Sequence, residues 1–135
     1  MKISKFILGT AQLTHNYGIA NNTECISNKK SEAILENSLN YGIKTWDTSP
    51  DYGQSEKLIG RFIKKNNPKI DISTKLPSII KKYGKNLKSM ELEKIISASI
   101  EKSLKDLNKE TIELFYIHDE NDLMVVNKSG ITIRI

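Results

Sequence analysis

The chain has 135 residues, of which 38% are hydrophobic and 27% charged, a balance typical of one globular domain or part of one. No run approaches the ~20 apolar residues of a membrane-spanning helix, and no signal-peptide pattern opens the chain, so we expect a cytoplasmic protein without a membrane partner. The net charge of +5 comes from dispersed lysines. That dispersion favours solvated helix faces over a nucleic-acid surface. The lone Cys25 and the widely separated His15 and His118 predict no metal site.

The first half of the chain alternates short apolar runs with amphipathic stretches. We predict a strand over 6–8, a polar loop over 11–27, a helix over 28–41, a strand over 43–47 and a helix from Ser55 to 66–68. Gly42 stands where the C-cap of the first helix is expected.

The second half continues this alternation. We predict a strand over 70–75, a lysine-rich loop over 77–88, a helix over 90–107 and a strand over 110–117. Ser89 is the expected N-cap of the long helix. Two β-prone runs flank the turn-like residues 127–130, which suggests a hairpin in the tail.

Strands that alternate with helices at this spacing indicate parallel βα units, hence an α/β fold. The runs Phe6–Leu8 and Leu114–Ile117 are almost entirely apolar, as in strands covered on both faces. Periodicity alone leaves two architectures open. One is about the first four strands of a (β/α)8 barrel, and the other is a small doubly wound sheet.

Four reactive side chains fall at or just beyond the carboxyl ends of predicted strands: Asp47, Tyr52, Lys75 and His118. Active sites of parallel α/β proteins lie at that edge. Each residue alone has an ordinary alternative, such as a turn-stabilising carboxylate or a solvated lysine. Together they suit hydride reduction of a carbonyl. Tyr52 would act as general acid, Lys75 would stabilise its phenolate, Asp47 would hold Lys75, and His118 would orient the carbonyl.

The segment TWDTSPDYGQSE over 45–56 resembles the active-site signature of the aldo-keto reductases. The likeness extends from LGTAQ over 8–12 to STK over 73–75 and the His118 strand. It implies a (β/α)8 barrel and metal-independent reduction of a small carbonyl substrate with NADP(H), NAD(H) being the other option. It also implies that Gly9, Thr10, Ala11, Gln12 and Asp47 lie near the nicotinamide and its ribose.

The chain departs from that family in length and in its tail. A complete barrel needs ~250 residues, and the family takes most cofactor contacts from later strands. The likeness ends at Leu123, so we expect a barrel-like part over 1–123 and a divergent β-prone tail over 124–135. We therefore expect the 135-residue chain alone to be inactive as an enzyme. A silent remnant, self-association through open sheet edges and an unrelated α/β binding domain stay open as alternatives.

Overall fold

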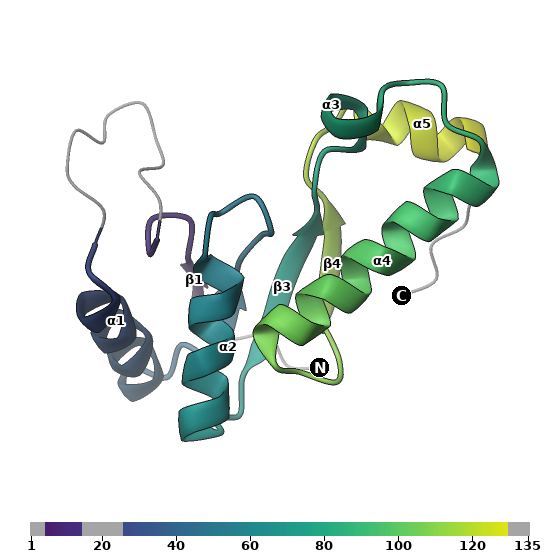
Figure 1. Ribbon diagram of the computed structural model, residues 1–135. Helices are drawn as coiled ribbons and strands as arrows, with labels where there is room; N and C mark the ends of the chain where they lie inside the picture. Colours follow the sequence, from purple (N-terminus) through teal and green to yellow (C-terminus); the bar gives the residue numbers. More distant parts are fainter. Residues whose placement is uncertain (1–4, 15–25, 130–135) are drawn as a thin grey trace.

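A computed structural model describes residues 5–14 and 26–129, which form one parallel sheet with helices between its strands (Figure 1). In chain order the elements are β1 (Ile7–Gly9), α1 (Asn28–Asn40), β2 (Thr45–Asp47), α2 (Ser55–Asn66), β3 (Asp71–Leu76), α3 (Ile79–Tyr83), α4 (Ser89–Leu107), β4 (Leu114–Ile117) and α5 (Asp122–Ser129). The strands lie in the order β1-β2-β3-β4, and every neighbouring pair is parallel. This confirms the predicted α/β fold of parallel βα units.

The strand register gives the sheet two different faces. Gly9, Asp47 and Ser73 are aligned across β1, β2 and β3, and their neighbours Trp46 and Ile72 point to the opposite face because side chains alternate along a strand. The long helices α1, α2 and α4 lie along the face that carries Trp46 (Figure 1). The face that carries Asp47 has no helix on it in the part of the chain that the structure describes.

The main core lies between the sheet and the helices. Trp46 is fully buried and meets the ring of Phe62 with centroids 5.7 Å apart. Its other buried members are Leu13, Leu35, Leu58, Ile59, Ile63, Ile70, Ile72 and Leu107. A second cluster joins the end of β3 to the later helices through Leu76, Ile79, Leu92, Ile96, Val125 and Val126. These apolar stripes explain why helices form here. Burial of its apolar face stabilises a helix more than the intrinsic helix propensity of its residues does.

Several predicted boundaries are confirmed within a few residues. The Ser27 hydroxyl caps α1 by accepting from the Lys30 N–H, and Gly42 follows the helix with φ +75°. Asn67 ends α2 in the left-handed conformation, as the Asn-Pro stop signal predicts. The strands β2 and β4 are shorter than predicted, whereas β1 has the predicted length and begins one residue later. Most of the polar loop expected over 11–27 lies outside the described residues.

Two expectations in the second half were wrong. The predicted loop over 77–88 contains the helix α3, whose first N–H groups at Ile79 and Ile80 bind the carboxylate of Asp122. Ser89 is the first residue of α4 rather than its N-cap. The cap is Lys88, whose N–H donates to the Glu91 carboxylate.

The predicted hairpin in the tail is also wrong where it can be compared. The first β-prone run and most of the expected turn form α5 instead. Val125 and Val126 are buried in the second core cluster, and this burial outweighs their strand preference. The second run, over 130–135, lies outside the described residues. No helix in the described ranges is long and apolar enough to cross a membrane.

Candidate functional site

The centre of the site is an ion pair between neighbouring strands. Asp47 ends β2, and Lys75 lies near the end of β3, so parallel pairing brings them to one edge of the sheet. Lys75 Nζ lies 2.8 Å from Oδ1 and 2.7 Å from Oδ2 of Asp47, and 2.9 Å from the carbonyl oxygen of Thr48. The Ser73 hydroxyl donates to Asp47 Oδ1 at 2.9 Å. The ammonium of Lys75 therefore has one acceptor for each of its three N–H groups.

Tyr52 lies directly against this pair. Its side chain is buried, with 8% of the residue exposed, and Lys75 Nζ is 5.0 Å from the centre of its ring. The turn that carries Tyr52 is tied to the sheet because the Thr14 hydroxyl donates to the Tyr52 carbonyl and the Tyr52 N–H donates to the Ser49 carbonyl. The ring is therefore held beside a cation at the strand ends.

His118 directly follows β4, the edge strand next to β3. Its ring meets the Tyr52 ring edge to face, with centroids 5.6 Å apart and an interplanar angle of 88°. Nδ1 lies 3.1 Å from Ser49 Oγ and 3.2 Å from Asp51 Oδ2. The structure thus brings Asp47, Tyr52, Lys75 and His118 together, although 71 positions separate the first from the last.

Residues at the exit of β1 support the same edge. Thr10 is fully buried, and both its N–H and its hydroxyl donate to the Asp47 carbonyl, at 2.9 and 2.8 Å. The Ser55 hydroxyl lies 2.9 Å from Thr10 Oγ1. Thr10 is therefore engaged in holding Asp47, while Gly9, Ala11 and Gln12 reach the surface at that edge.

Two supporting residues were missed in the sequence. Ser49 and Asp51 lie inside the signature segment and contact His118, and only the closing of the turn onto β4 reveals this. The sequence shows both residues close to Tyr52, but Ser, Pro and Asp also occur together in ordinary turns that have no function.

Glu56 lies in the first turn of α2, where a carboxylate suits the helix dipole, and the structure gives it a second role. Its side chain is buried behind β3, where Thr74 donates to Oε1 at 2.7 Å. Burial raises the pKa of this carboxyl above its ordinary value, and the Thr74 hydrogen bond offsets part of that rise. Because Thr74 precedes Lys75, Glu56 anchors the strand from the side opposite the site.

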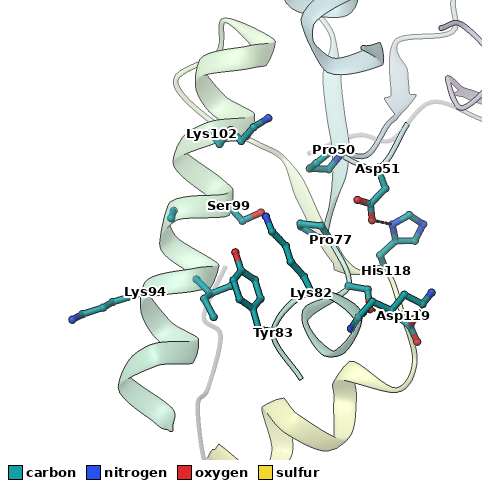
Figure 2. Close-up of a pocket in the computed structure, with 14 residues that line it drawn as sticks. Pro50, Asp51, Pro77, Lys82, Tyr83, Lys94, Ser99, Lys102, His118 and Asp119 are labelled. Atoms are coloured by element: carbon teal, nitrogen blue, oxygen red, sulfur yellow. Dashed lines mark hydrogen bonds and ion pairs between the residues drawn. The ribbon is translucent and has the colours of Figure 1, made fainter. Parts of the chain in front are cut away.

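A cavity of about 1110 Å³ opens beside His118, between α3, α4 and the strand ends (Figure 2). Asp51 and His118 lie on one side of it, Lys94 and Lys102 project from α4 on the other, and Lys82 lies between the two sides (Figure 2). Lys81 pairs with Asp119 on its rim at 2.9 Å. No group of three or more His, Cys, Asp or Glu side chains suited to a metal ion occurs within residues 5–14 and 26–129.

The profile of the Aldo/keto reductase family matches residues 5–123, which is most of the chain. Among curated proteins, the versiconal hemiacetal acetate reductase of Aspergillus parasiticus is 37% identical over 70 residues, which are 50% of this chain and 19% of that protein.

Solved structures show the same likeness. An aldo-keto reductase of Pseudomonas aeruginosa superposes with a TM-score of 0.71 at 25% identity, over 95% of this chain and 48% of that one. The glycerol dehydrogenase of Gluconobacter oxydans gives a TM-score of 0.60 at 24% identity, over 95% of this chain and 42% of that one, and so shares the fold. The chain spans about half the length, or less, of the relatives that it matches.

Proposed function

Since this chain belongs to the aldo/keto reductase family, we propose that its strand-end cluster is the proton-donating centre of an NAD(P)H-dependent carbonyl reductase. The observation that carries the proposal is the contact of Tyr52 with the Lys75–Asp47 ion pair. Family membership alone would not require these three groups to meet. In this chain they lie together at the sheet edge where parallel α/β proteins bind their substrates.

Tyr52 is proposed as the group that protonates the carbonyl oxygen. When a phenol donates its proton, a negative charge is left on its oxygen, and a nearby cation lowers the free energy of that state. Lys75 supplies the cation, and Asp47 holds the ammonium in place through two short contacts. Because the pair is assembled before any substrate arrives, little reorganisation is needed during the reaction.

His118 is proposed to hold the substrate carbonyl. Its ring packs edge to face on Tyr52, so a hydrogen bond from His118 and the phenol of Tyr52 can converge on one oxygen atom. Hydrogen-bond donors aimed at the position where negative charge develops typically contribute ~3–4 kcal/mol to transition-state stabilisation.

The residues present fit the redox end of a nicotinamide cofactor. NADP(H), or NAD(H), would supply the hydride when bound. Gly9 lies at the exposed edge beside Asp47, and a Cβ added to it would meet nothing within 4 Å, so this edge is open enough for a flat ring to approach. Ala11 and Gln12 border the same opening. Thr10 donates a hydrogen bond to the backbone carbonyl of Asp47, and we propose that it affects the cofactor only by positioning Asp47.

A second candidate function is a catalytically silent association module. The helix-free face of the sheet exposes Ile7 and Tyr116, at 51% and 49%, and β1 and β4 form the two edges of the sheet in the described residues. Such edges and apolar side chains favour pairing with another chain. Under this second proposal Asp47, Tyr52, Lys75 and His118 are present but catalyse no reaction.

The proposal is tested by calorimetric titration of the purified chain with NADPH and NADH, followed by an assay of aldehyde-dependent NADPH oxidation. Trp46 fluorescence is a poor readout because its ring is buried on the helix side of the sheet. Chain length alone predicts inactivity, but the assembled contacts of Tyr52, Lys75 and Asp47 lead us to expect activity, with saturable binding below ~1 mM, the upper end of common KM values. Turnover should be lost in Tyr52→Phe and kept in the control Tyr41→Phe, whose side chain is exposed at the end of α1.

Absence of binding up to ~1 mM would overturn the reductase proposal for this chain. Analytical ultracentrifugation then decides about the alternative. A concentration-dependent dimer that is weakened by Tyr116→Lys would support association through the open face, and a monomer at all concentrations would exclude it.

A further inference from the structure

Two side chains of the signature turn meet the same nitrogen of His118. Ser49 Oγ lies 3.1 Å from Nδ1, and Asp51 Oδ2 lies 3.2 Å from it (Figure 2 shows the Asp51 contact). We infer that Ser49 and Asp51 are positioning residues for His118: Ser49 keeps the proton of the neutral ring on the other nitrogen, Nε2, and Asp51 is the partner of Nδ1 when the ring is charged. The catalytic meaning of this inference rests on the proposed function, but its test does not.

The neutral ring is determined by the hydroxyl of Ser49. This residue is fully buried, and its Oγ already accepts the Asp51 N–H at 3.2 Å. Its hydroxyl hydrogen needs an acceptor, because a buried donor without a partner costs about 1–3 kcal/mol. In the part of the chain that the structure describes, the acceptor it meets is Nδ1 of His118. A neutral imidazole that accepts at Nδ1 must carry its proton at Nε2.

In the charged ring, the carboxylate of Asp51 is the partner of Nδ1. In the imidazolium form both ring nitrogens are donors, so Nδ1 can no longer accept from Ser49. Asp51 Oδ2 lies within hydrogen-bonding distance of Nδ1 and accepts this proton in a charge-assisted bond. Nε2 again carries a proton. The turn therefore offers Nδ1 one partner for each state of the ring, and Nε2 is a donor in both states.

Other charged groups around His118 do not compete for Nδ1. Asp119 follows it in the chain, but its carboxylate is held by Lys81 at 2.9 Å and by the amide of Asn121. Lys75 is engaged with Asp47 and Thr48. The remaining cations of the cavity are Lys82, Lys94 and Lys102, which can only donate and so cannot take the proton of Nδ1.

The arrangement matters because a carboxylate alone would produce the opposite tautomer. A neutral imidazole beside Asp51, without Ser49, places its proton on Nδ1 to donate to the carboxylate. Nε2 would then be an acceptor, and its lone pair would repel a carbonyl oxygen. Ser49 prevents this in the neutral ring, and Asp51 stabilises the donor form when the ring is charged. The substrate would meet a hydrogen-bond donor at Nε2 in both states of the ring.

The test is nitrogen NMR of ring-labelled histidine at about pH 8, where a free imidazole is mostly neutral. His15→Gln serves as the background, because the chain has two histidines and this leaves one ring signal. We expect His118 to show the shifts of the Nε2–H tautomer. Ser49→Ala should convert most of the neutral ring to the Nδ1–H tautomer. Asp51→Asn, the matched control, should keep Nε2–H because Ser49 remains.

A wild-type ring that carries its neutral proton on Nδ1 would overturn the inference, and so would a Ser49→Ala variant that retains Nε2–H. Circular dichroism of both variants establishes that they are folded, and Ser49→Thr, which restores a hydroxyl, should restore the Nε2–H tautomer. None of these readouts needs cofactor or turnover. Failure of NADPH binding would therefore leave this result standing, and the two proposals can fail separately.

Discussion

Lys75 lies with its ammonium 5.0 Å from the centre of the Tyr52 ring while both oxygens of Asp47 hold it from the other side. The three groups come from two neighbouring strands and the turn that follows the first of them. Asp47 therefore fixes the position of the Lys75 ammonium, and the Tyr52 ring packs against this fixed charge. This relationship leads to the first prediction.

Lys75→Met should remove the cation while preserving most of the side-chain volume. We expect a loss of turnover of ~100-fold or more, because no charge would stabilise the phenolate of Tyr52. The fold should lose only ~1–2 kcal/mol, since Asp47 keeps 29% of its side chain exposed and can rehydrate. Urea denaturation and the NADPH oxidation assay measure the two effects separately.

A double-mutant cycle with Asp47→Asn is the control for that experiment. If the pair acts as a unit, the double variant should be less destabilised than the sum of the single variants by ~1 kcal/mol or more. Strictly additive losses would show that Lys75 and Asp47 stabilise the fold independently, against the structure.

Glu56→Gln should change how stability depends on pH. Burial raises the pKa of Glu56 above its ordinary value of 4.5, so the folded state binds this proton more tightly than the unfolded chain does. The resulting stabilisation is present below the ordinary pKa and is lost as pH rises through the raised value. Glutamine cannot ionise, so the variant should gain stability relative to the wild type as the pH rises above 4.5, the ordinary pKa of the carboxyl.

Urea denaturation of both proteins at several pH values measures this difference directly. Asp119, whose pKa is lowered by its contact with Lys81, contributes the opposite slope at acidic pH. It is present in both proteins, so its effect cancels in the comparison. A difference in unfolding free energy that stays constant with pH would contradict the assignment for Glu56.

Gly60→Ala should destabilise the contact between α2 and the end of α4. A Cβ at this position would overlap the Asp106 carbonyl oxygen and would lie 2.9 Å from the carbonyl carbon of Leu107. The two helices would have to separate, at a cost of ~1–3 kcal/mol despite the better helix propensity of alanine. Gly9→Ala is the matched control, because its Cβ would meet nothing within 4 Å. Equal melting temperatures of the two variants would refute the close approach.

Asp122→Ala should release α3 from α5. The buried carboxylate of Asp122 accepts the N–H groups of Ile79 and Ile80 at 2.8 and 2.9 Å. Removing it leaves two donors at a helix start unpaired, at a cost of about 2 kcal/mol. Asp122→Asn keeps one acceptor and should lose about half as much. Hydrogen exchange at Ile79 and Ile80 should accelerate in the alanine variant, and unchanged protection would refute the cap.

The sequence by itself determined the repeated strand–helix pattern, because the apolar residues that define each helix or strand lie close together in the chain. Leu58, Ile59, Phe62 and Ile63 recur at helical spacing and are all buried in α2. It also determined that Asp47, Tyr52, Lys75 and His118 would gather at one edge, since the carboxyl ends of parallel strands share an edge.

Only the tertiary structure decided the features that depend on contacts between distant segments. Residues 77–88 carry no strong helix signal and residues 124–126 favour a strand. The helices α3 and α5 form because Asp122 caps the first of them and Val125 and Val126 are buried in the shared core. The partners of His118 follow the same rule. Ser49 and Asp51 reach it across more than sixty positions, and a local pattern cannot encode which state of a ring a remote hydroxyl will select.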